Sequence, residues 1–220
     1  MKLQYLGDSK DSFKWDYHHF LMEALGYSQL TIAWMLTPDD GGADGNTAPE
    51  LFAAREEIIN FCHQLRDTRN ANLLLELPET TGARYTVSFH ETEESLGEPQ
   101  KNAFFSGIKA NSDHIVFLDP DNGFEPERTS TDKHVRYADL DRLVRSIPPN
   151  AVVTVFQHHR RKKFPDDFAR IRERLLSGYS TAVYWHSLMF VCVSSSKETI
   201  HRVSEINREY AKQRPVKVIT

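Results

Sequence analysis

The sequence predicts an α/β protein whose mostly parallel sheet carries helices on both faces. Segments with strand patterning alternate with segments of helical patterning, which is typical of parallel sheets because parallel strands need long crossover connections. The run 113–119 is apolar on both faces, as expected for a central strand covered on both sides. Residues 181–187 and 188–195 follow one another almost without a break, so they predict a C-terminal antiparallel pair.

Length and composition favour one domain spanning residues 1–220. The chain has 220 residues with 40% hydrophobic content, enough for one substantial core. Its net charge of −4 argues against an overall basic nucleic-acid surface but allows a local basic patch. Cys62 and Cys192 lie alone in apolar segments and are interpreted as buried thiols. No apolar stretch is long enough to cross a membrane, so we expect a cytoplasmic protein without membrane association.

The first helix is predicted over residues 11–25, where apolar residues recur at helical spacing. Asp11 is the expected N-cap, and Gly26 is expected to end the helix. The sequence YHH at 17–19 is interpreted as part of the helix surface. The next run, 30–36, is apolar and β-branched and predicts a buried strand.

The later elements are predicted from the same two signals, the spacing of apolar residues and the turn residues between segments. Strands are expected at 83–91, 113–119 and 151–159, and helices at 48–67, 99–109, 137–147, 166–176 and 197–213. Because parallel strands end at one edge of the sheet, where such folds bind ligands, three segments should meet there. These are PDDGGADG after the strand at 30–36, DPDNG after 113–119 and QHHRRKK after 151–159.

The order of elements, with parallel strands followed by a late antiparallel pair, resembles the class I S-adenosylmethionine-dependent methyltransferase fold. FLDPDNG (117–123) stands where amino-methylating members carry [D/N]PP[Y/F], and DSFKWDYHHFL (11–21) resembles a lysine-bearing helix of the 23S ribosomal RNA adenine methyltransferase group. The chain is also similar to an uncharacterised bacterial family that contains LDPDNG and opens with Y-x-G-D-x-x-D-x-x-K, which is met here by Tyr5, Gly7, Asp8, Asp11 and Lys14. The resemblance implies a three-layer, Rossmann-like domain.

The same resemblance implies methyl transfer from S-adenosylmethionine to an amino group of a nucleic acid. For this function the candidate catalytic residues are Asp119, Pro120, Asn122 and His158, and the candidate cofactor-binding residues are Lys14, Asp8, Asp39 and Asp44. Substrate binding is assigned to Phe124, which would stack on a base, and to His159, Arg160, Arg161, Lys162 and Lys163, which would hold phosphates. We expect Asp8, Lys14, Asp119, Asp121 and His158 to line one cleft.

Two other functions remain open. The loop after residue 36 lacks the E/D-x-G-x-G turn of methyltransferases and is rich in acids, which favours a divalent-metal phosphodiesterase or nuclease. In that case Asp119 and Asp121 would bind Mg²⁺ or Mn²⁺, and His158 would act on water or the leaving group. The third possibility is a non-catalytic module that binds a nucleotide or a protein partner. For each motif a structural role also stays open: an Asx turn at Asp119 to Asn122, and a solvated basic turn at 160–163.

Overall fold

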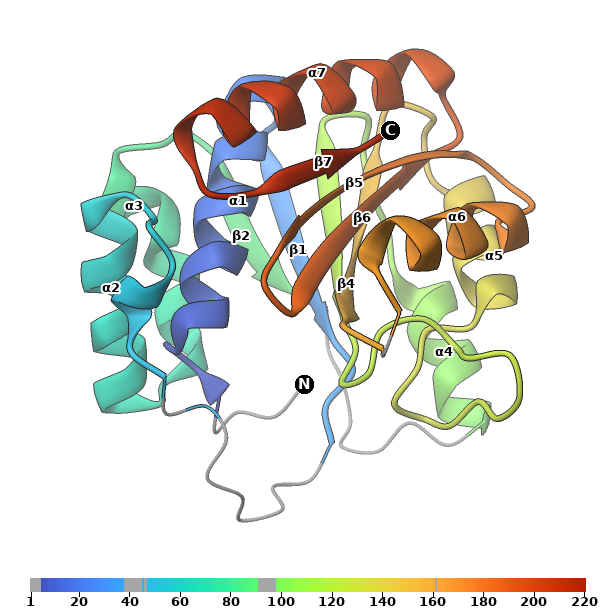
Figure 1. The fold of residues 1–220 in the computed structure, drawn as a ribbon, viewed down its shortest axis with the longest axis horizontal. Coiled ribbons are helices and arrows are strands. Elements are labelled where there is room, and N and C mark those ends of the chain that lie inside the picture. Colours follow the sequence, from blue (N-terminus) through green and yellow to red (C-terminus); the bar gives the residue numbers. More distant parts are fainter. Residues whose placement is uncertain (1–4, 38–44, 46, 91–97, 161) are drawn as a thin grey trace.

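A computed structural model describes residues 5–37, 45, 47–90, 98–160 and 162–220 (Figure 1). Within these ranges the chain is an α/β protein with one seven-stranded mixed sheet in the order β2-β1-β3-β4-β6-β5-β7, which is compatible with a Rossmann-like fold. The strands are β1 (Gln29–Trp34), β2 (Thr86–Phe89), β3 (His114–Asp119), β4 (Val152–His158), β5 (Tyr179–Trp185), β6 (Leu188–Ser194) and β7 (Lys217–Ile219).

Strand directions agree with the sequence expectation. Strands β2, β1, β3 and β4 are parallel to their neighbours, whereas β6 runs antiparallel to both β4 and β5. Strand β7, which the sequence analysis did not predict, pairs with β5 at the sheet edge. The predicted C-terminal antiparallel pair is therefore confirmed as β5 and β6.

The helices also lie close to their predicted positions. They are α1 (Ser9–Leu25), α2 (Glu56–Thr68), α3 (Leu77–Thr81), α4 (Glu98–Gly107), α5 (Tyr137–Ser146), α6 (Phe164–Arg174) and α7 (Lys197–Gln213), with 3-10 turns η2 (Pro49–Leu51) and η3 (Ala71–Glu76). The predicted helix 48–67 is split into η2 and α2, because Phe52 is extended after the short turn. Turn η3 and helix α3 were not predicted.

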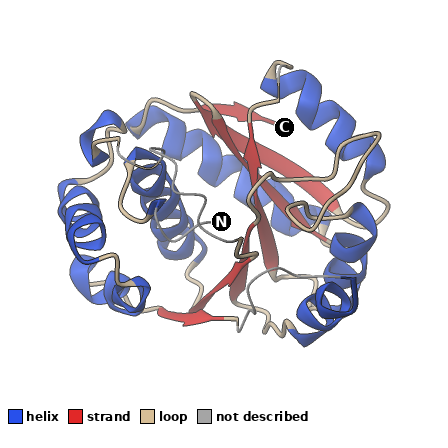
Figure 2. Ribbon diagram, turned by 90° about the horizontal axis from the view of Figure 1, so that it is seen from below, coloured by secondary structure: helices blue, strands red, loops and turns tan. Residues whose placement is uncertain are grey.

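Helices lie on both faces of the sheet (Figure 2), and the core consists of two hydrophobic clusters, one on each face. One cluster joins the sheet to α1, α2 and α7, and the other joins it to α4, α5 and α6. Neighbouring residues of β3 belong to different clusters, with Phe117 in the first and Leu118 in the second. Both faces of the central strand are therefore buried, which explains its continuous apolar sequence.

Helix α1 corrects two predictions. It begins at Ser9, and Asp8 caps it by accepting hydrogen bonds from the backbone N–H groups of Lys10 and Asp11, so the assignment of Asp11 as N-cap was wrong. The sequence YHH is not on the surface either: Tyr17, His18 and His19 are all fully buried. The helix packs between α2, α7 and the sheet, so polar side chains on several of its faces are enclosed.

Buried His18 links α1 to the middle of the sheet. Its Nδ1 lies 2.7 Å from the Lys14 carbonyl oxygen, and its Nε2 lies 2.7 Å from Thr154 Oγ1 on β4. Because a carbonyl only accepts, Nδ1 carries the proton and Nε2 accepts from the threonine hydroxyl. Burial, the largest cause, lowers the pKa of His18 from 6.5 to about 3, so the ring is neutral at pH 7.

We expect acidification to destabilise the fold through His18. Its pKa is lower in the folded state, so its contribution to stability is present above pH 6.5 and lost as pH falls toward 3. From pH 7 to pH 5 one such histidine removes about 2 kcal/mol. Urea unfolding at both pH values should therefore show that His18→Gln loses about 2 kcal/mol less than the wild type. Equal losses in the two proteins would contradict this role.

Candidate active site at the switch point of the sheet

The sheet changes its direction of growth between β1 and β3. The chain adds β2 on one side of β1 and then crosses back to add β3 on the other side. In open α/β sheets, ligands bind outside the carboxyl ends of the strands at such a switch point. Asp119 is the last residue of β3 and lies beside Trp34, the last residue of β1. The topology therefore places Asp119 at the position where a ligand is expected.

A pocket lies directly at this point. It is lined by Tyr5, Asp8, Lys10, Asp11, Lys14, Asp119, Pro120, Asp121, Phe156 and His158. The structure thus brings together all five residues that the sequence analysis expected in one cleft. The cavity formed by the described residues has a volume of about 20 Å³, which is the size of one water molecule or one small polar group.

Lys14 is the central charge of the site. Its Nζ lies 2.8 Å from Asp119 Oδ2 and 3.0 Å from Asp11 Oδ1, and the side chain is 3% exposed. The ammonium also faces aromatic rings, with ring centroids at 5.4 Å for Trp15 and 5.5 Å for Phe156. Burial alone would lower the pKa of Lys14, but the two carboxylates outweigh it and the pKa is raised. Lys14 is therefore charged, and its anionic partners belong to the protein itself.

The segment before α1 forms one wall of the pocket. Gly7 donates its N–H to Asp11 Oδ2 at 2.8 Å, and Asp8 caps the helix. Burial, followed by repulsion from Asp11, raises the pKa of Asp8 from 3.8 to about 6. The last four residues of the Y-x-G-D-x-x-D-x-x-K pattern thus have structural roles. Gly7 forms the turn, Asp8 caps α1, Asp11 accepts a hydrogen bond from the turn, and Lys14 reaches β3.

Asp121 and His158 also line the pocket. Burial would raise the pKa of Asp121, yet it lies below the ordinary value, with the Lys133 ammonium 3.5 Å away among the charges that lower it. The pKa of His158 is lowered to about 4, first by burial and then by Lys10. At pH 7 the pocket therefore contains a neutral imidazole beside an ionised Asp121 carboxylate.

Phe124 is not available to a substrate. It is fully buried, and its ring stacks on Tyr137 with the ring centroids 5.4 Å apart, so the assignment as a base platform was wrong. Gln157 at the end of β4 fixes this turn by accepting the Phe124 N–H at 2.8 Å. Gly123 has a φ of +85°, and a Cβ there would lie 2.3 Å from Gln157 Oε1. The sequence analysis missed Gln157, because a single amide in a strand gives no sign of a partner in a distant loop.

The basic segment after β4 divides into structural and exposed residues. Arg160 donates to the Phe124 carbonyl and, at 3.0 Å, to Gln157 Oε1, so it supports the turn rather than projecting as a free cation. Lys162 and Lys163 are exposed, although Lys162 lies 3.5 Å from Glu127. His159 is exposed at the same sheet edge, as is Asn122. Arg161 lies outside the described residues.

The proposed metal site is not formed by the described residues. Within them, no group of three or more histidine, cysteine or acidic side chains is placed to hold a metal ion. Asp119 turns one oxygen to Lys14, whereas Asp121 approaches Lys133. The Lys14 ammonium lies between the Asp11 and Asp119 carboxylates, where a metal cation would otherwise be attracted. Asp39 and Asp44 lie outside the described residues.

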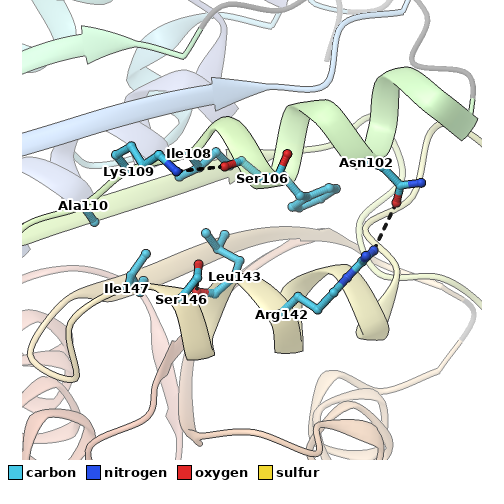
Figure 3. Close-up of a pocket in the computed structure, with 10 residues that line it drawn as sticks. Asn102, Ser106, Ile108, Lys109, Ala110, Arg142, Leu143, Ser146 and Ile147 are labelled. Atoms are coloured by element: carbon cyan, nitrogen blue, oxygen red, sulfur yellow. Dashed lines mark hydrogen bonds between the residues drawn. The ribbon is translucent and has the colours of Figure 1, made fainter.

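A second pocket lies between α4 and α5 and contains none of the predicted site residues. Its volume is about 260 Å³, and its polar rim includes Asn102, Lys109 and Arg142. Figure 3 shows Arg142 directed at Asn102 and Lys109 at the Ser106 carbonyl oxygen, at distances of 3.1 and 3.2 Å. Both cations are thus already engaged within the protein, and the pocket has no catalytic side chain at its base.

No protein-family model matches the sequence, and no curated protein is significantly similar to it. The methyltransferase resemblance therefore stays a hypothesis. None of the helices in the described part of the chain combines the length and apolarity that crossing a bilayer requires.

Proposed function

We propose that this protein is a methyltransferase-like, three-layer α/β enzyme that transfers a methyl group from S-adenosylmethionine to an amino group of a nucleic acid. The observation that carries the proposal is the position of Asp119 at the end of β3 and at the switch point of the sheet. Two further observations support it: the reversed strand β6 lies between β4 and β5, and separate hydrophobic clusters cover the two faces of the sheet.

In the proposed chemistry, Asp119 and the Pro120 carbonyl accept hydrogen bonds from the substrate amine. These bonds orient the nitrogen lone pair toward the methyl donor. The small cavity suits an amino group and not a whole base, so the rest of the nucleotide lies across the open side of the pocket. Tyr5, which lines the pocket, replaces Phe124 as the aromatic platform in our proposal. Neutral His158 serves as the hydrogen-bond acceptor that receives a proton from the product amine.

The remaining residues hold this arrangement in place. Because both of its ionic partners are protein carboxylates, Lys14 is a positioning residue for Asp119 in our proposal, rather than a cofactor ligand. S-adenosylmethionine would supply an electrophilic methyl group and leave as the thioether when its methyl–sulfur bond breaks, and Asp8, which lines the pocket, would contribute to its site. Exposed Lys162 and Lys163 at the end of β4 would contact phosphates.

Metal-dependent hydrolysis has less support. A cation bound between Asp119 and Asp11 would first have to displace an ammonium that is 2.8 and 3.0 Å from their oxygens. A non-catalytic module remains an outcome of the experiment below, in which ligand binding would be seen without turnover.

We expect Asp119→Asn to lower methyl transfer by about 10²-fold or more while leaving S-adenosylmethionine affinity within a few-fold of wild type. Transfer of labelled methyl groups to RNA and to DNA measures the first quantity, and calorimetry measures the second. Asp132→Asn, an exposed acid of the same loop, is the matched control and should retain activity. A thermal melt of each variant checks that it is folded.

The same calorimetry distinguishes the alternatives. Manganese binding that disappears in both Asp119→Asn and Asp121→Asn, with no heat from S-adenosylmethionine, would replace our proposal by the phosphodiesterase. Cofactor binding without transfer to any nucleic acid would leave a binding module.

A further inference from the structure

A third pocket lies at the opposite end of the sheet from Asp119. It is formed by the start of β5, the end of α6 and one side of α7, and its volume is about 330 Å³. Strand pairing fixes its position: Ser180 of β5 is opposite Val193, which is opposite Val153 near the beginning of β4. The pocket is therefore level with the amino ends of the parallel strands and is separate from the site described above.

Four basic side chains line the pocket together with Thr220, and three of the four have no anionic partner among the described residues. Helix α7 contributes Lys197, His201 and Arg208, and α6 contributes Arg172. Among the described residues, none of Lys197, Arg208 and Arg172 forms an ion pair, whereas His201 lies 3.6 Å from Glu205. Lys197 is also the first residue of α7, where the helix dipole is positive and an anion is stabilising. The charge of this pocket is therefore suited to an anionic ligand.

An unpartnered hydroxyl gives a second, independent sign of a ligand. Ser204 lines the pocket between His201 and Arg208 and is 5% exposed, yet its Oγ has no hydrogen-bond partner. The Oγ of Ser180, on the facing strand, is buried without a partner as well. Buried polar atoms are nearly always hydrogen-bonded, so two such hydroxyls in one pocket indicate that a polar group fits between them.

We propose that this pocket binds a nucleotide through its phosphate group. Arginine and lysine side chains are the usual phosphate ligands, and the two hydroxyls can donate to phosphate oxygens. Tyr179, a residue of the pocket wall that is 48% exposed, offers a ring on which a base can stack. The pocket volume lies at the lower end of the range for small-molecule sites, which suits a mononucleotide. The ligand is either a free nucleotide or one residue of a nucleic-acid chain.

Calorimetry with AMP, adenosine, inorganic phosphate and a short single-stranded oligonucleotide tests this site. We expect AMP to bind at least about tenfold more tightly than either adenosine or phosphate, because the pocket recognises both the nucleoside and the phosphate group. Binding of the oligonucleotide more tightly than AMP would assign the site to a chain, and the reverse order to a free nucleotide. Phosphate that binds as tightly as AMP would overturn the nucleotide assignment, and AMP that fails to bind at millimolar concentration would overturn the site.

Four variants show where the ligand binds. Lys197→Ala/Arg208→Ala should weaken AMP binding at least about tenfold, whereas Arg202→Ala/Lys212→Ala, with the same charge change on the same helix, should not. Ser204→Ala should weaken binding about 3- to 10-fold without lowering the melting temperature, because its hydroxyl has no partner in the protein. Asp119→Asn should bind AMP as the wild type does. Loss of AMP binding in Asp119→Asn, with wild-type affinity in Lys197→Ala/Arg208→Ala, would place the ligand at the switch point and refute this inference.

Discussion

Replacing Lys14 by methionine is expected to destabilise the fold by about 3–5 kcal/mol, because it leaves two buried carboxylates without their cation. Asp11 and Asp119 are each 1% exposed, and both have an oxygen within 3.0 Å of the lysine nitrogen. Methionine has a similar volume and should keep the packing against the surrounding rings. The loss of stability therefore measures mainly the effect of removing the positive charge. Urea unfolding at pH 7 with circular dichroism gives the free energy of unfolding.

Lys10→Met is the control for this change. Lys10 lines the same pocket one turn earlier but forms no ion pair within the described residues, so its replacement should lower stability by less than about 1 kcal/mol. Adding Asp119→Asn to Lys14→Met should recover part of the loss, because one unpaired charge is removed. Equal effects of Lys10→Met and Lys14→Met would show that the carboxylates do not depend on Lys14.

The arrangement of strands could be predicted because it follows from local pattern and chain connectivity. Residues 113–119 and 151–159 were recognised as buried parallel strands, and they are neighbours in the sheet, with β3 between β1 and β4. That expectation alone was enough to bring Asp119 and His158 into one pocket. Lys14 was expected to bind a cofactor, and the local pattern could not show that its partner is Asp119, 105 residues away.

The errors have a common physical origin in packing between distant segments. Asp8 and Asp11 are both acceptable N-caps, and local pattern does not decide between them. The tandem histidines were placed on the surface because polar side chains usually face solvent, whereas α1 is enclosed on nearly every side and buries them. Phe124 was placed in the cleft because it follows the motif, whereas Gln157 holds its backbone and turns the ring into the core.

Gly7 shows most directly how the fold creates the site. Its φ is +78°, and a Cβ there would lie 2.2 Å from the Cys62 carbonyl oxygen and 2.4 Å from the Arg66 nitrogen. Both contacts are with the backbone of α2, so no side chain can move away to make room. The close approach of this turn to α2 sets where Asp8 caps α1, and the start of α1 in turn sets where Lys14 meets Asp119. A change at Gly7 should therefore affect both stability and the pocket.

We expect Gly7→Ala to lower the free energy of unfolding by about 3–5 kcal/mol, the sum of backbone strain and a forced separation from α2. Gly26→Ala is the matched control, because Gly26 also has a positive φ, +69°, but nothing lies within 4 Å of its Cβ position. That variant carries only the backbone strain and should lose about 1 kcal/mol. Urea unfolding of both variants measures the difference, which reports the contact with α2. If the two substitutions lowered stability equally, the turn would not be held against α2, and the position of Lys14 would need another cause.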